Sequence, residues 1–193
     1  MKTKTKVLVL SLSAVLLVAV SVFSTIAFLK SSDNVVNTFT VGKVEITLDE
    51  VKVDEYGNAD STGERVKTNT YKLIPSHTYT KDPTVHFLAG SEASYLFVKV
   101  ENGLADIEKA GTTIESQILD NGWTALSGQT GVYYKLVDAT ATNVDYVVFS
   151  SFTVADEANV SSYSTAKINI TAYAIQADGF EGNPSLAYSK VTE

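Results

Sequence analysis

The residues that could carry out chemistry in this chain are few, and the two histidines come first among them. His77 and His86 are nine positions apart, on either side of Pro83, in a stretch whose pattern indicates a loop leading into a strand. A metal site would need both histidines and a distant carboxylate, since ligands only have to converge in space. No HExxH motif is present, so we expect solvent-exposed histidines near a strand end rather than a zinc site.

Other catalytic and metal-binding patterns are incomplete. No GxSxG elbow supports a serine nucleophile, and "GSEAS" at 90–94 is typical of a turn between strands. The acidic stretch that starts at Asp54 does not match an EF-hand loop, because Ala59 replaces the expected glycine and Arg65 the terminal glutamate. Unspecific calcium binding there stays open. We predict no catalytic residue, no defined metal site and no cofactor.

Aromatic residues raise a third possibility, a platform for sugar rings. Aromatic side chains that alternate along strands more often pack in the core or against a sheet face. We therefore expect core packing, with Trp123 as a cap on the core. The residues concerned are Trp123, Tyr133, Tyr134, Tyr146 and Phe149.

The N-terminus has the layout of a secretory signal peptide. Lysines at positions 2, 4 and 6 precede an apolar run over 7–20, and small residues follow at 24–27. We predict cleavage after Ala27, with Thr25 and Ala27 at the recognition positions and Phe28 as the new N-terminus. An uncleaved anchor is the alternative, because a run extended to Leu29 reaches the ~20 residues of a membrane span. Either way, we expect an exported protein.

The remaining residues, 28–193, are expected to form one domain. They number 166, enough to bury a sizeable core. Without the leader's three lysines, 12 basic and 22 acidic residues give a formal charge of −10. Such acidity argues against nucleic-acid binding, which needs lysine and arginine for the phosphates. The chain has no cysteine, which excludes disulfides and thiolate chemistry.

Hydrophobic alternation with period two predicts an all-β fold. Seven to nine short strands separated by turn residues indicate a sandwich or barrel, and one inserted helix is compatible with a jelly roll. The helix is expected within 104–122, capped by Thr113 and stopped at Asn121-Gly122. Extended runs are predicted over 44–48, 66–74, 85–89, 95–101, 132–137, 145–154, 167–176 and 186–191.

Three segments taken together resemble the TasA and camelysin (CalY) family of Gram-positive bacteria. They are "NTFTVGKVEITLDE" (37–50), "YKLIPSHTYTKDPTVHFLAGSEASYLFVKVE" (71–101) and "VFSSFTV" followed by "KINITAYAIQADGF" (148–180). The resemblance covers nearly all of the chain after the leader. It implies an exported jelly-roll protein of the biofilm matrix or cell surface, whose leader is removed by a peptidase of the SipW type.

The resemblance also implies a structural role, that of a fibre subunit with itself and other matrix proteins as its expected partners. In the family the new N-terminal segment can pair into the next subunit's sheet. Here that segment is 28–41, and the expected assembly residues are Val35, Val36, Phe39 and Val41. Two alternatives stay open: a camelysin-like surface metalloprotease, for which no zinc-ligand motif is present, and a monomeric adhesin that binds carbohydrate.

Overall fold

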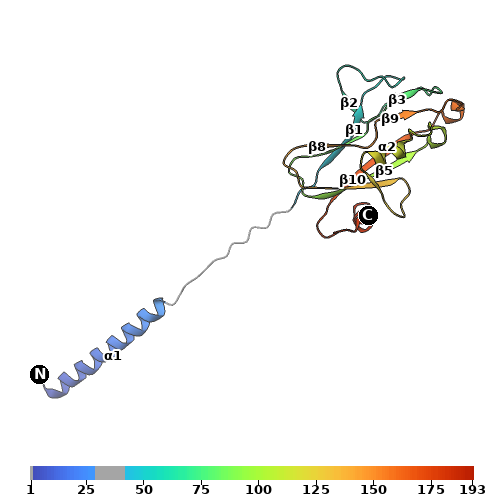
Figure 1. Ribbon diagram of the computed structural model, residues 1–193. Coiled ribbons are helices and arrows are strands. Elements are labelled where there is room, and N and C mark those ends of the chain that lie inside the picture. The colour runs from blue at the N-terminus through green and yellow to red at the C-terminus, as the bar shows by residue number, and fades with distance from the viewer. Residues whose placement is uncertain (1, 29–41) are drawn as a thin grey trace. The chain divides into compact units, whose positions relative to one another are not determined.

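The computed structural model describes residues 2–28 and 42–193, which belong to two units that divide at residue 41 (Figure 1). The first unit contains one helix, α1 (Thr3–Phe28). Among the described residues, no helix is both long and apolar enough to cross a membrane. The signal peptide stays a prediction.

The second unit is built mainly from strands, so the predicted all-β class is confirmed. Every strand pair in it is antiparallel. The strands are β1 (Ile46–Val51), β2 (Arg65–Val66), β3 (Thr78–Thr80), β4 (Thr84–Phe87), β5 (Ser94–Asn102), β6 (Thr124–Ala125), β7 (Val132–Val137), β8 (Val144–Val147), β9 (Ser151–Thr153) and β10 (Ile168–Gln176). The helices are α2 (Ile114–Asp120), α3 (Pro184–Val191) and two 3-10 turns, η1 (Ala105–Ile107) and η2 (Val160–Tyr163).

The strands form two four-stranded sheets and one short pair. The first sheet has the order β2-β1-β4-β8, the second β10-β5-β7-β6, and β3 pairs with β9. The short pair continues the β4–β8 ladder, because Thr84 lies opposite Val147 and Thr80 lies opposite Ser151 in one unbroken register. Pro83 interrupts this ladder, since it has no N–H to donate; its carbonyl accepts from the Val148 amide at 2.8 Å.

Alternation along β5 assigns the two faces of the second sheet to two cores. Leu96, Val98 and Val100 are buried in the main core, between the two sheets. Tyr95 and Phe97 point to the opposite face and are buried in a smaller core, where Ala187 of α3 packs. Successive residues of a strand face opposite sides, so this apolar run supplies both cores. All residues of both cores lie between positions 44 and 191, so the second unit holds both cores.

Several predicted elements differ from the structure. The predicted strand at 186–191 is wrong, because these residues belong to α3, which Asn183 caps and Pro184 begins. The run over 145–154 consists of two strands separated at 148–150, opposite the Pro83 interruption. Within 66–74, only Val66 joins a named strand. The runs over 95–101, 132–137 and 167–176 correspond closely to β5, β7 and β10.

The predicted helix and its cap are confirmed. The Thr113 side chain accepts from the amide of Ser116 at 3.2 Å, and Ile114 and Ile118 of α2 are buried in the main core. The side chain of Glu108 also accepts from the Ile114 amide, at 3.0 Å. Two of the free amides at the start of the helix are therefore satisfied by side chains.

Replacing Thr113 with alanine should lower the free energy of unfolding by about 1 kcal/mol, the usual value of a lost N-cap. Urea unfolding of residues 28–193 measures this change. Thr113→Ser retains the hydroxyl acceptor and is the matched control, expected to stay close to the parent protein. An alanine variant as stable as the parent protein would show that Glu108 holds the helix start alone.

Candidate functional site

The predicted processing and assembly residues lie at or beyond the limit of the first described unit. Thr25, Ala27 and Phe28 belong to the last turns of α1. The assembly residues Val35, Val36, Phe39 and Val41 lie outside the described residues. Their roles stay predictions, and they require a surface on the described domain that accepts the segment.

Strand β10 is an edge strand that offers such a surface. Its nine residues all pair with β5 on one side. Within 42–193, no strand pairs with its other side and no hydrogen bond reaches its backbone there. A strand edge with unpaired amides and carbonyls is a template for another strand. We call this side of β10 the open edge.

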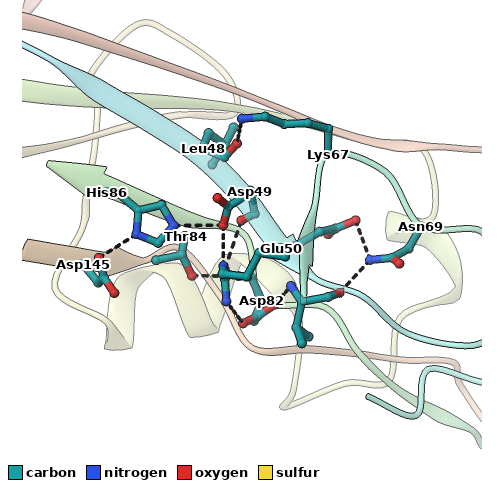
Figure 2. Close-up of polar contacts among 11 residues, drawn as sticks. Leu48, Asp49, Glu50, Lys67, Asn69, Asp82, Thr84, His86 and Asp145 are labelled. Atoms are coloured by element: carbon teal, nitrogen blue, oxygen red, sulfur yellow. Dashed lines mark hydrogen bonds and ion pairs between the residues drawn. The ribbon is translucent and has the colours of Figure 1, made fainter. Parts of the chain in front are cut away.

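The opposing sheet is also incompletely paired on the side of the open edge. Strand β1 lies next to β10, and β2 pairs only with Glu50 and Val51 at one end of β1. In the middle of β1, the carbonyl of Leu48 accepts from the ammonium group of Lys67 (Figure 2). A lysine at a strand edge discourages pairing by another strand. An added strand would therefore pair with β10 rather than with β1.

Apolar side chains between β1 and β10 are only partly covered. They pack on the main core but stay half-buried, whereas the central residues of β4 and β5 are fully buried. The β1 side provides Val44, Ile46 and Leu48, and β10 provides Ile168, Ile170, Ala172 and Ala174. Covering them with further apolar surface would contribute roughly 25 cal/mol per Å².

The opposite side of the main core is closed by the segment around α2. Trp123 donates from its indole nitrogen to the Val147 carbonyl at 3.0 Å, and Asn121 donates to the Val148 carbonyl at 3.1 Å. Gln117 accepts from the amides of Ser150 and Ser151. No described segment covers the open edge in this way. The domain is therefore asymmetric, with one covered side and one open side.

An apolar hollow adjoins one end of the open edge. It is small, with a cavity volume of about 30 Å³, and Ile168 at the start of β10 is one of its walls. The other apolar walls are Tyr71, Leu73, Tyr79, Leu104 and Phe152. A hollow of this composition suits an apolar side chain rather than a charged ligand.

Lys81, which also lines the hollow, belongs to a buried ion pair with Glu50. Lys81 Nζ lies 2.6 Å from Glu50 Oε2, and the two side chains are only 9% and 7% exposed. Asn69 donates to the other oxygen of Glu50 at 3.0 Å and to the Val51 carbonyl at 2.8 Å (Figure 2). Burial, with the charge of Glu50, raises the pKa of Tyr71, whose ring lies 5.7 Å from Lys81 Nζ.

These buried polar groups are paired with one another. Across the described residues, no buried side-chain nitrogen or oxygen lacks a hydrogen-bond partner. The Lys81–Glu50 pair ties β1 to the segment between β3 and β4.

The two histidines do not meet at one site. His77 Nε2 lies 2.7 Å from the Tyr56 carbonyl, whereas His86 lies between the carboxylates of Asp49 and Asp145. The expectation of a solvent-exposed side chain is wrong for His86, which is only 17% exposed. In 2–18 and 42–193, no three histidine or carboxylate side chains are arranged to hold a metal ion.

The acidic loop is folded by its own carboxylates. Asp54 accepts from the amides of Tyr56 and Asn58 at 2.9 Å, and Asp60 accepts from the Thr62 amide at 2.7 Å. Hydrogen bonds from Asn58 lower the pKa of Asp54, and those from Thr62 lower the pKa of Asp60. These are turn-forming contacts, so the loop is explained without a bound cation.

The aromatic residues are mainly core residues, as predicted. Trp123, Tyr133 and Phe149 are buried, and Tyr134 and Tyr146 are half-buried. The predicted role of Trp123 as a cap on the core is confirmed by its burial and its bond to the Val147 carbonyl. Within the described surface, these five residues form no exposed aromatic platform.

Sequence reasoning missed the open edge and the polar environment of His86. Both depend on which strands become neighbours, and the order of strands is not visible in periodicity.

Comparison of the chain with protein-family models, with curated proteins and with solved structures finds no match.

Proposed function

We propose that this protein is a secreted structural subunit of extracellular biofilm matrix fibres, of the TasA and camelysin type. Its folded domain is a jelly roll, and a peptidase of the SipW type removes the leader after Ala27. Segment 28–41 of one copy then pairs with the open edge of the next copy. The observation that carries the proposal is this unpaired edge, with its row of half-covered apolar side chains.

The sequence of segment 28–41 suits the open edge. In an extended chain Val35, Phe39 and Val41 point to one side, and that side would face the half-buried residues of β1 and β10. Burying each such side chain contributes roughly 1.5–3 kcal/mol. Part of this gain is lost to the ordering of the segment and to association itself. Backbone hydrogen bonds to β10 would supply affinity, and the alternating side chains would fix the register.

The geometry of this contact favours a filament. The donor segment and the acceptor edge are different parts of the molecule, so each copy can accept one neighbour and donate to another. Such head-to-tail contacts generate open filaments when the rotation does not close a ring. Before cleavage the segment is still joined to α1, so removal of the leader would act as the trigger for assembly.

The proposal is tested by electron microscopy of purified residues 28–193 and 42–193 over a concentration series. We expect filaments from 28–193 and a monomer from 42–193, because the deletion removes the donor segment and leaves both cores intact. Filaments from both proteins would place the contact elsewhere. If neither forms filaments, the fibre proposal fails; stoichiometric zinc with chelator-sensitive proteolysis would then indicate a protease, and glycan binding by the monomer an adhesin.

A further inference from the structure

His86 occupies the centre of a polar cluster on the first sheet. It lies on β4, opposite Asp145 of the edge strand β8 and next to β1. Its Nδ1 is 2.6 Å from Asp145 Oδ1 and its Nε2 is 2.8 Å from Asp49 Oδ1 (Figure 2). The imidazole ring thus bridges three adjacent strands through side chains alone.

The two contacts determine the protonation state of the ring. An ionised carboxylate only accepts hydrogen bonds, so each ring nitrogen must donate one. Both nitrogens carry hydrogen only in the imidazolium form. A neutral ring would direct one lone pair at a carboxylate oxygen less than 3 Å away, which is repulsive.

The surrounding charges favour the same form. Asp49 also accepts from Arg65 of β2, and Arg65 reaches Asp82 at 3.0 Å from its Nη1. The cluster therefore contains three carboxylates and, besides His86, one cation. Burial lowers the pKa of His86, but the hydrogen bonds and charges of Asp49 and Asp145 outweigh it, so its pKa lies above the ordinary 6.5.

The two links of His86 are unequal. The Asp49 side chain is 22% exposed and is also held by Arg65. The Asp145 side chain is 62% exposed, and among the described residues its side chain contacts only His86. A ring that loses one proton would keep the hydrogen on Nε2 for Asp49 and release Asp145 to water. The link to β8 is the one that breaks.

We propose that His86 is a proton-dependent link that fastens the edge strand β8 to the rest of the first sheet. The link is closed when the imidazole is protonated and bridges Asp49 and Asp145. It opens when the ring becomes neutral, and β8 then keeps its backbone ladder to β4 and the Trp123 hydrogen bond to the Val147 carbonyl. This regulation is independent of the proposed fibre contact, which lies at β10 on the other sheet.

The pH window follows from the direction of the shifts. The pKa of His86 is raised on folding, so the link contributes fully below the unfolded value of 6.5 and is lost as the pH rises through the higher folded value. Burial alone would raise the pKa of Asp49, but the hydrogen bonds and charges of Arg65 and His86 outweigh it, so the pKa lies below its ordinary value. The contribution of Asp49 to the link is therefore lost only in acid. The link is therefore strongest between mild acid and neutrality.

The test uses nuclear magnetic resonance on residues 28–193. We expect the ring of His86 to titrate above 6.5, and Asp145→Asn to shift this midpoint downward. Hydrogen exchange, corrected for intrinsic rates, should show protection of the β8 amides falling about three- to tenfold between pH 5.5 and 8, the effect of one partly exposed charged link. The amides of β5, in the other sheet, should show no such change.

Two variants separate the link from other effects of pH. His86→Gln should show equal β8 protection at both pH values, whereas His77→Gln, which alters the other histidine, should behave as the parent protein. The proposal is overturned if His86 titrates at or below 6.5, or if β8 protection in the parent protein does not change with pH. The ring titration and the hydrogen exchange of the parent protein need no variant, so together they decide the matter even if His86→Gln fails to fold.

Discussion

Replacing Lys81 with methionine is expected to lower the free energy of unfolding of residues 28–193 by about 3–5 kcal/mol. The substitution leaves the Glu50 carboxylate, whose side chain is 7% exposed, with Asn69 as its remaining polar partner. Small domains are stable by only about 5–15 kcal/mol, so a large share of the stability would be lost. Urea denaturation followed by circular dichroism measures the change.

Two further variants show whether burial of the pair is the cause. Lys52 forms an ion pair with Glu64 in which both side chains are about half exposed, so Lys52→Met should lower the free energy of unfolding far less than Lys81→Met. Combining Lys81→Met with Glu50→Leu removes both charges and should be less harmful than Lys81→Met alone. If Lys81→Met and Lys52→Met cost the same, water must reach Glu50 and the pair is not a buried anchor.

Local patterns predicted the elements whose signals lie within one segment. Alternation located β7 at residues 132–137 and the long runs that became β5 and β10. Thr113 and the Asn121-Gly122 stop bounded α2, because capping and termination depend on neighbouring residues. The same kind of signal exists for α3, since Asn183 and Pro184 are a cap and a first-turn proline. The apolar residues after them were interpreted as a strand, and the start signal of α3 was therefore missed.

Other features depend on residues far apart in the chain. The break between β8 and β9 lies opposite Pro83, more than sixty positions away, so no pattern within 145–154 reveals it. The polar cluster depends on β1, β4 and β8 becoming neighbours, which brings His86 between Asp49 and Asp145. The open edge of β10 follows from its place at the end of the sheet order. Strand order therefore sets the limit of what this sequence could predict.

A negative charge at position 39 is expected to abolish filament formation and leave the domain folded. In the proposed contact, the Phe39 ring is buried among the half-covered residues of β1 and β10 of a neighbouring copy. Phe39→Asp removes roughly 1.5–3 kcal/mol of apolar burial and adds the larger cost of burying an unpaired carboxylate. Negative-stain microscopy and light scattering of residues 28–193 measure assembly, and urea denaturation of the monomer measures folding.

Thr40→Asp is the matched control, because position 40 faces the opposite side of an extended segment and its charge would remain in water. This variant should form filaments at nearly the concentration that the parent protein requires. Filaments that persist in Phe39→Asp would remove Phe39 as the anchor of the contact. If Phe39→Asp instead unfolds, the ring belongs to the core of its own domain, and the segment completes its own sheet rather than that of a neighbour. Strand addition between copies predicts a different pair of results. The Phe39→Asp monomer stays folded but does not assemble, whereas Thr40→Asp forms filaments.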